Sequence, residues 1–366
     1  MKRSQIISIA LVIVLIAFAI AGCAAKEPAA PEATNEPAQE TKTQEATNEK
    51  PAQEETKEVD LSKFKVGFAQ DTLNQPWRNY QAECVKKVFA EYGINCEVTD
   101  GQGKAEKQIS NIEDMVANGL DLLVVSPAQE AALTPVVEQV YQKGIPVVCI
   151  DRGIKSDAYT TFVHADNILI GAMAADFIAE KMTEKYGEPK GNVVVIEGVP
   201  GSTTAVQRDE GFRKRIQEKY PNLKILASQP ADYRRDLAMA VMEDYLQAYD
   251  NIDAVFTHAD EMTMGAIAAI ENAGRRNEMI IASVNGTMEA IKAIMDGRMD
   301  CSVLYSNCSG PGVEYAVKLL KGEEVPKNVV IEALVIDTEN AAEYYKEGAY
   351  SPDPMPLEEG KYTIIK

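Results

Sequence analysis

Histidine and tryptophan are scarce in this sequence of 366 residues, which has two histidines, His164 and His258, and one tryptophan, Trp77. Nothing near either histidine supplies a nucleophile at a defined spacing. The sequence also lacks a GxGxxG motif, a P-loop and a cluster of residues with metal-ligand spacing. These absences leave an enzyme as a remote alternative, and they predict neither a cofactor nor a metal.

Positive charge is also in short supply, because 37 lysines and arginines face 56 acidic residues and the net charge is −19. A chain of this balance does not suit the phosphate backbone of nucleic acids. Cysteine is sparse and, apart from Cys23, odd in number, and its spacing suggests neither a disulfide framework nor a zinc site. We therefore expect buried thiols at Cys84, Cys96, Cys149, Cys301 and Cys308.

The N-terminus carries a basic start, an apolar run from residue 6 to 20, and then Ala21-Gly22-Cys23. This order is that of a secretory signal peptide, and the apolar run is short for a membrane span. The segment Ile20-Ala21-Gly22-Cys23 resembles the lipobox of bacterial lipoproteins, although an ordinary signal with a chance cysteine remains the alternative. We expect a signal peptide over 1–22 and lipidation at Cys23, and hence an extracytoplasmic, membrane-held protein.

Residues 23–60 are dominated by Glu, Pro, Ala, Thr, Gln and Lys, and the stretch 32–42 returns in slightly altered form as 45–57. Such a segment has too little apolar surface to offset its ordering entropy, so it is expected to be a disordered acidic tether. Its length favours the surface of a Gram-positive-type cell over a periplasm.

The remaining residues alternate Val- and Ile-rich runs with helix-period segments, often punctuated by glycine. This pattern predicts α/β lobes with parallel sheets covered by helices, and the length favours two lobes. Strands are expected at 65–70, 96–99, 120–126, 145–151, 160–164, 192–197, 223–228, 252–258, 279–284 and 302–305. Helices are expected at 76–92, 105–118, 130–143, 169–185, 205–219, 234–249, 262–273, 288–296 and 312–321.

Ligands of such sheets bind beyond the carboxyl ends of the strands, so the residues that follow each strand are the candidates. The first strand is followed by Asp71, Asn74, Gln75 and Trp77, and the fourth by the pair Asp151-Arg152. Carboxylate, guanidinium and indole together suit a polyhydroxylated ring. Acids after strands also cap helices, and we interpret Asp166, Asp260 and Glu261 in that way first.

Seven motifs in the stretch from Phe64 to about Val335 resemble the ribose/galactose-type periplasmic binding proteins. They are Thr72–Trp77, Gln108–Asp114, Gly144–Arg152, Glu197–Ser202, Arg208–Phe212, Gln229–Asp232 and Asp260–Gly265. The resemblance implies a type I fold: two doubly wound parallel-sheet lobes, joined by three crossovers, that close on a small sugar and deliver it to an ABC permease. It implies an N-terminal lobe of residues 61–165 and 306–333, and a C-terminal lobe of 166–305 and 334–366.

The resemblance also assigns roles to particular residues. Asp151, Arg152 and Arg208 match residues that contact sugar in the family, and Asn74 matches its first motif. Trp77 and Tyr233 stand where the family has ring-stacking aromatics. Besides Asp71, which follows the first strand, the other expected site residues are departures from the family pattern: Gln75, Arg78, Ser126, His164, Ala259, Asn285 and Tyr305.

These departures imply that a ribose-shaped set of partners is not preserved. Arg78 stands where an aromatic is usual, and Asn285 where an aspartate is usual, so the cleft is expected to be less acidic. That change suggests an acidic or carbonyl-rich ligand such as a sugar acid, unless Arg78 pairs with Asp71 and leaves the pocket neutral. We expect a monomer. The competing role is a ligand-loaded partner of a membrane sensor kinase or chemoreceptor.

Overall fold

The structure is a computed structural model that describes residues 59–352 and 362–365. The predicted signal peptide, Cys23 and the tether up to residue 58 lie outside the described residues. The Asp60 carboxylate accepts a hydrogen bond from the Ser62 amide and caps the short 3-10 helix η1, Leu61–Lys63. Within the two described ranges, the helices are too short or too polar to cross a bilayer.

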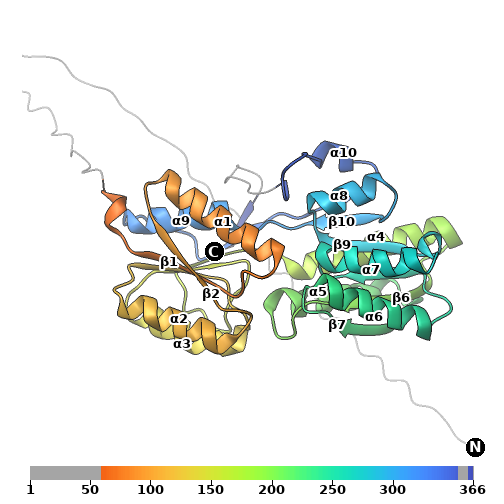
Figure 1. Ribbon diagram of the computed structural model, residues 1–366, viewed down its shortest axis with the longest axis horizontal. Helices are drawn as coiled ribbons and strands as arrows, with labels where there is room; N and C mark the ends of the chain where they lie inside the picture. Colours follow the sequence, from red (N-terminus) through yellow and green to blue (C-terminus); the bar gives the residue numbers. More distant parts are fainter. Residues whose placement is uncertain (1–58, 353–361, 366) are drawn as a thin grey trace, which may run out of the picture. The chain divides into compact units, whose positions relative to one another are not determined.

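The first sheet has the strand order β13-β11-β5-β4-β3-β1-β2 among the described residues (Figure 1). Its strands are parallel except β13, which runs antiparallel to β11. Helices α1 and α9 cover one face, and α2 and α3 cover the other. This N-terminal lobe comprises β1 (Val66–Gln70), α1 (Pro76–Glu91), β2 (Cys96–Asp100), α2 (Ala105–Ala117), β3 (Leu122–Val125), α3 (Glu130–Gln142), β4 (Val147–Ile150), β5 (Thr161–Ala165), α9 (Ser309–Leu320), β11 (Asn328–Ile331) and β13 (Tyr362–Ile365).

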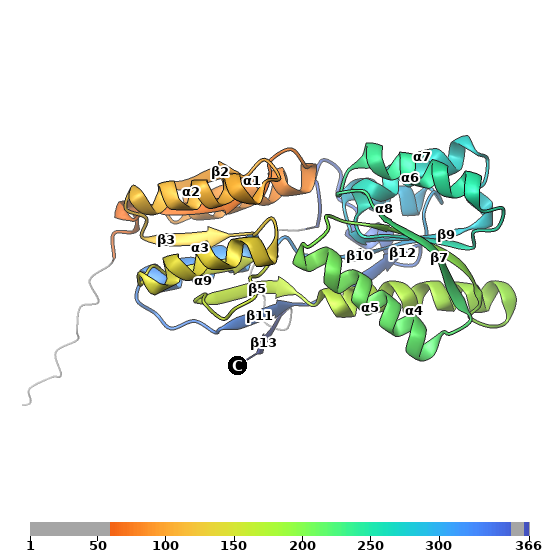
Figure 2. The same cartoon turned by 90° about the horizontal axis from the view of Figure 1, so that it is seen from below.

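The second sheet has the order β12-β10-β9-β8-β6-β7, with only β12 antiparallel to its neighbour (Figure 2). Helices α4 and α5 pack on one face, and α6, α7 and α8 pack on the other. This C-terminal lobe comprises α4 (Asn167–Tyr186), β6 (Gly191–Glu197), α5 (Thr203–Lys219), β7 (Leu223–Pro230), α6 (Arg235–Ala248), β8 (Ala254–Thr257), α7 (Asp260–Asn272), η2 (Arg276–Glu278), β9 (Ile280–Asn285), α8 (Met288–Met295), β10 (Cys301–Leu304), β12 (Leu334–Asp337) and α10 (Ala341–Tyr344).

Strand composition explains why each sheet lies between two helix layers. All four residues of β3, Leu-Leu-Val-Val, are fully buried, as are those of β4. A parallel strand covered on both faces needs apolar side chains in both directions, which gives the continuous runs seen in the sequence. The predicted α/β class with two parallel-sheet lobes is therefore confirmed.

The chain passes between the sheets after β5, after β10 and after β11. At the first passage Asp166 caps α4, accepting from the Leu169 amide at 2.9 Å, as expected for an acid that follows a strand. The residues between β10 and α9 and those between β11 and β12 make the other two passages. These three connections leave the carboxyl ends of β5, β10 and β11.

One domain prediction is wrong. Residues 334–366 were assigned to the C-terminal lobe, but β13 pairs with β11 and lies at the edge of the first sheet. The physical reason is that β11 would otherwise present unpaired backbone groups along that edge. Strand β13, which follows α10 in the sequence, therefore belongs to the N-terminal lobe.

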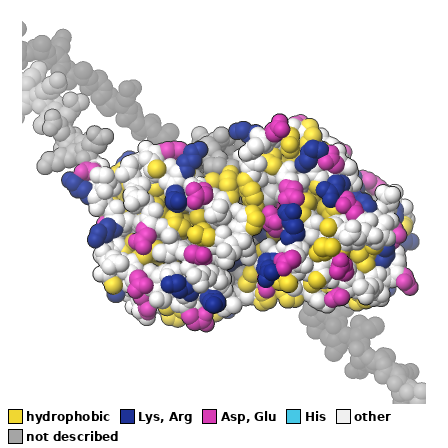
Figure 3. All heavy atoms as spheres, in the orientation of Figure 1, with side chains coloured by type: hydrophobic (Ala, Val, Ile, Leu, Met, Phe, Trp, Pro, Cys, Tyr) yellow, Lys and Arg dark blue, Asp and Glu magenta, His cyan; other side chains and the backbone are white. Residues whose placement is uncertain are grey.

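The surface drawn in Figure 3 mixes acidic and basic side chains on both lobes. On that face no broad basic area gathers over any one element. The five cysteines of the folded part are all buried, and burial raises the pKa of the Cys149 thiol to about 12. Within the described ranges there is no group of three or more potential metal ligands.

Candidate functional site

A cavity lies where the carboxyl ends of strands from both sheets meet. The N-terminal lobe supplies the start of α1 and the residue after β4, and the C-terminal lobe supplies residues next to β7, β8, β9 and β10. The lining residues are Gln75, Trp77, Arg78, Asp151, Thr204, Arg208, Tyr233, Ala259, Glu261, Asn285 and Tyr305.

Three lining residues have backbone φ angles in the left-handed region: Asp151 at 65°, Tyr233 at 57° and Asn285 at 126°. Asp151 comes directly after β4, Asn285 ends β9, and Tyr233 lies in the turn between β7 and α6. Such conformations are unfavourable for residues other than glycine and persist only where the surroundings impose them. Their concentration around one cavity indicates that the strand ends are shaped to aim these side chains inward.

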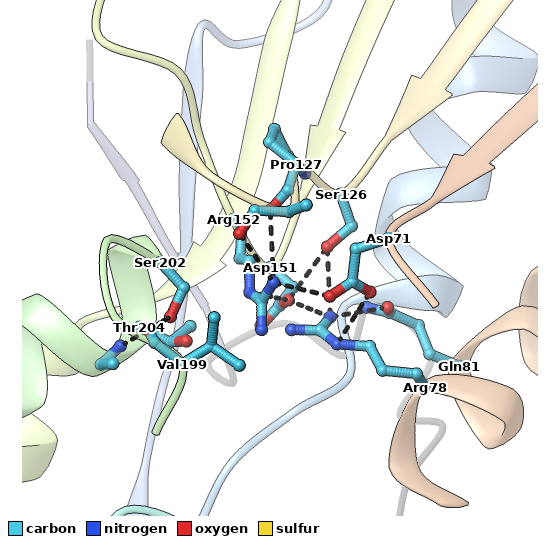
Figure 4. Close-up of polar contacts among 12 residues, drawn as sticks. Asp71, Arg78, Gln81, Ser126, Pro127, Asp151, Arg152, Val199, Ser202 and Thr204 are labelled. Atoms are coloured by element: carbon cyan, nitrogen blue, oxygen red, sulfur yellow. Dashed lines mark hydrogen bonds and ion pairs between the residues drawn. The ribbon is translucent and has the colours of Figure 1, made fainter. Parts of the chain in front are cut away.

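Asp151 is the centre of a buried polar cluster in the N-terminal lobe (Figure 4). Its carboxylate pairs with Arg78 and accepts from the hydroxyls of Ser126, at 3.1 Å, and Tyr305. Burial alone would raise the pKa of Asp151, but the charges of Arg78 and Arg152 and the hydrogen bond from Tyr305 hold it below its usual value. Asp151 is therefore an ionised acceptor in the cavity wall.

Arg78 connects this carboxylate to a second one. Its Nε lies 3.3 Å from Asp71, and its Nη1 donates to Gln81 and to Ser126, each at 3.1 Å. Burial opposes the charge of Arg78, but Asp151 and Asp71 outweigh that effect and raise its pKa. The sequence left open whether Arg78 would pair with Asp71, and the structure shows that it pairs with both acids.

Arg152 lies behind the cavity wall rather than in it, and is 1% exposed. Its Nη1 donates to Asp71 at 2.7 Å and to the Pro127 and Ala128 carbonyls at 3.3 and 3.4 Å. Its guanidinium carbon is 5.8 Å from the centre of the Tyr233 ring in the other lobe. Arg152 therefore holds Asp71 in place and borders the opposite lobe.

Arg208, on α5, is the cation that the C-terminal lobe contributes. Its Nε donates to Asn167 at 2.9 Å, its Nη1 donates to the His258 carbonyl, and its guanidinium lies 4.4 Å from the Tyr305 ring centre. Helix α5 can place it there because Gly171 of α4 has no side chain: a Cβ would lie 2.1 Å from the Arg208 carbonyl oxygen. A close contact between α4 and α5 thus positions this arginine.

His258 is buried beside Arg208 and stays neutral. Burial, followed by the charges of Arg208 and Arg213, lowers the pKa of His258 to about 3. Its Nδ1 accepts a hydrogen bond from the Gly198 amide at 3.3 Å. This histidine thus adds no positive charge next to Arg208 at neutral pH.

Aromatic rings from both lobes form the apolar walls. Trp77 of the N-terminal lobe and Tyr305, which follows β10, have ring centres 5.7 Å apart. The Tyr233 hydroxyl shares a hydrogen bond of 2.9 Å with Thr204, and the ring packs so closely on Gly198 that a Cβ there would lie 2.1 Å from it. Gln75 bridges the lobes by donating to the Asp232 carbonyl at 3.0 Å.

Nine of the fourteen residues expected from the sequence line the cavity. Three more stand directly behind it and hold the lining groups: Asp71, Ser126 and Arg152. Asn74 is exposed on the loop before α1 and lines no part of the cavity. Its amide N–H donates to Thr72, so its part is to shape this loop.

The structure does not bring His164, an expected site residue, to the cavity lining. Side chains alternate along β5, and His164 shares the face of Phe162, whose ring stacks on it with centres 4.1 Å apart. Sequence reasoning also missed two lining residues, Thr204 and Glu261. Glu261 lies in the first turn of α7, as expected, where it pairs with Arg235 at 3.0 Å. Both missed residues lie in the first turn of a helix that follows a strand, which is the signal that could have found them.

Comparison with known proteins gives consistent matches over the described lobes. The family model described as periplasmic binding protein domain matches residues 66–324. The galactofuranose-binding protein of Escherichia coli is 34% identical over 275 residues, which cover 73% of this chain and 85% of that protein. The ribose import binding protein of Bacillus subtilis is 32% identical over 269 residues, which also cover 73% and 85%.

A solved structure supports the same likeness in three dimensions. The fructose-binding periplasmic domain of a hybrid two-component system matches with a TM-score of 0.72 at 32% identity. The match covers 76% of this chain and 92% of that domain.

Proposed function

The chain belongs to the periplasmic binding protein family, and on that basis we propose that it captures one small sugar or sugar-like molecule between its lobes and delivers it to an ABC permease. It is a binding protein, as its relatives are, rather than an enzyme. We further propose that it is extracytoplasmic and anchored through a lipid on Cys23.

The observation that carries the proposal is the composition of the cavity. Aromatic rings from both lobes, Trp77, Tyr233 and Tyr305, supply apolar faces for the C–H side of a sugar ring. Asp151 offers an ionised acceptor, and Arg208 offers a cationic donor, so hydroxyls can both donate and accept. Because these groups come from two lobes, a ligand that contacts all of them favours the closed arrangement.

A thermal-shift screen over pentoses, hexoses, polyols, sugar acids and nucleosides tests ligand capture. A ligand that binds only the folded state stabilises it by RT ln(1 + [L]/Kd), or about 2.7 kcal/mol at a hundredfold excess over Kd. Calorimetry then gives the affinity and a stoichiometry of one. If no compound of the screen raises Tm, or binding does not saturate at one site, the proposal is wrong.

A sensor role is the second candidate, because one structural relative is a periplasmic domain of a hybrid two-component system. Uptake of the labelled ligand in a strain that lacks this gene separates the two roles. Import predicts that uptake falls and returns with the restored gene, whereas sensing predicts normal uptake with loss of the ligand-induced response.

Mass spectrometry of the native mature N-terminus tests the proposed lipid anchor. A Cys23 without acyl mass, in a host that processes lipoproteins, would contradict the proposal that the protein is anchored through this residue.

A further inference from the structure

Arg208 is a buried cation in the cavity wall that has no carboxylate partner among the described residues. Arg208 is 2% exposed. The groups that hold it are all neutral: the Asn167 amide oxygen, the His258 carbonyl and the ring of Tyr305. Its Nη2 group donates to nothing in the described part of the chain, although the residue lines the cavity.

The other charged groups around the cavity are already paired. Arg78 and Arg152 share Asp71 and Asp151 in the buried cluster of the N-terminal lobe. Glu261, the remaining acid of the lining, pairs with Arg235. Two cations and two anions of the cluster therefore cancel, and Arg208 is left as the uncompensated charge of the wall.

Two further groups could have compensated it and do not. Asp260 is buried near the start of α7, but its oxygens accept from the Thr287 amide and the Ser302 hydroxyl, at 2.7 and 2.8 Å, and it does not line the cavity. Asn285 does line the cavity, and its amide side chain makes no hydrogen bond within the described ranges. An aspartate at this position would place an anion in the cavity, but an asparagine cannot.

We propose that the ligand itself supplies the missing anion, and that it is a sugar acid whose carboxylate receives the donors of Arg208. This inference rests on the proposed function and specifies its substrate class. A buried charge is costly unless it is paired, and the planar fork of a guanidinium matches a carboxylate in a bidentate geometry. The sugar hydroxyls are then left for Asp151, Thr204 and Asn285.

Calorimetry on the wild-type folded protein tests the class directly. A set of hexuronates and aldonates is compared, each beside its neutral parent sugar and, for a uronate, beside its neutral amide. We expect the best carboxylate to bind at least tenfold tighter than its parent and its amide. If neutral sugars bind as well as or better than every acid, the sugar-acid inference fails while the proposed function stands. If no sugar of either kind binds, both fail.

The variant Asn285→Asp tests the electrostatic argument at one position. It adds to the cavity a carboxylate that is available to Arg208, so the affinity for the acid should fall at least tenfold and the preference over the neutral parent should shrink. Asn222→Asp, on an exposed turn of the same lobe, makes the same charge change outside the cavity and should leave both affinities unchanged. If Asn285→Asp behaves like this control, or tightens acid binding, the inference is overturned. If it does not fold, the comparison of acid with amide in the wild type decides.

Discussion

The hydroxyl of Tyr305, which follows a strand of the C-terminal lobe, donates to the carboxylate of Asp151, which follows a strand of the N-terminal lobe. Burial and the charge of Asp151 raise the pKa of the Tyr305 phenol, so it remains a donor. The contact joins two connections from different sheets at the back of the cavity. The position of the Asp151 carboxylate in the cavity wall therefore depends on the arrangement of both lobes.

Tyr305→Phe removes this donor with little change in shape. A buried hydrogen bond to a charged group contributes about 1.5–3 kcal/mol, and a neutral one about 0.5–1.5 kcal/mol. The free energy of unfolding in urea should therefore fall more for Tyr305→Phe than for Tyr159→Phe, whose hydroxyl donates to the neutral Asn328 at 3.0 Å. Equal losses would mean that the contact with Asp151 is not made in solution.

Asp151→Asn removes the charge that Arg78 and Arg152 share. Breaking a buried pair on one side costs about 3–5 kcal/mol of stability, and truncating a charged contact to a ligand about 2–5 kcal/mol of binding. We expect a folded but less stable protein by circular dichroism, and at least tenfold weaker ligand binding by calorimetry.

Asp176→Asn is the matched control for this change. Asp176 pairs with Arg215 on the half-exposed surface, where an ion pair is worth about 0–1 kcal/mol. Its effect on stability should be small, and its effect on ligand affinity should be absent. Unchanged affinity in Asp151→Asn as well would exclude Asp151 from the binding site.

The sheets were predictable because their signal is local. A buried parallel strand such as β3 must be apolar on both faces, and the glycines after the helices separate one unit from the next. Strand β13 gave no such signal. It is an antiparallel edge strand that no crossover helix precedes, so only its pairing with β11 identifies its sheet.

The sequence predicted those cavity-lining residues that directly follow or end a buried strand, such as Asp151 and Asn285. It was not predictable at His164, because the position in the chain does not show which face of β5 that side chain takes. The sequence also could not show which carboxylates pair with Arg78. Its two carboxylates lie on separate strand ends, and only the sheet order β4-β3-β1 brings them together.

The pH dependence of stability should contain two opposing contributions. His258 has its pKa lowered to about 3, so below pH 6.5 the unfolded chain binds a proton that the folded one excludes. Its contribution to stability is therefore lost as pH falls. Burial raises the pKa of Asp260 to about 6, so the folded state takes up a proton first and gains stability as pH falls from 6 towards 3.8.

Comparing each variant with the wild type isolates these contributions. The stability of the wild type relative to His258→Gln should decrease as pH falls from 7 to 5, by up to about 1.4 kcal/mol per unit. The stability of the wild type relative to Asp260→Asn should increase as pH falls from 6 to 4. Urea unfolding at each pH measures both, and a difference that is independent of pH for either variant contradicts the corresponding shift.

Trp77 provides an optical test of the cavity because it is the single tryptophan of the chain. It is 9% exposed, lines the cavity, lies 5.7 Å from the Tyr305 ring and has the Arg78 guanidinium 4.7 Å from its own ring. A ligand that stacks on the indole displaces water from its exposed edge. We expect a saturable change in its emission, and lower quenching by acrylamide, at the same Kd that calorimetry gives.

Trp77 also belongs to the apolar core cluster that includes Ala165 and Ile170, and a purely structural role makes a different prediction. In that case calorimetry would detect binding while emission and quenching stayed constant. Trp77→Phe supplies the control: it should abolish the optical signal and keep a measurable but weaker affinity, because a smaller ring leaves part of the stacking face. If Trp77→Phe binds with the affinity of the wild type, and the emission of Trp77 in the wild type does not change on binding, then the ligand does not contact Trp77. The binding site would then lie against the wall formed by Tyr233 and Arg208.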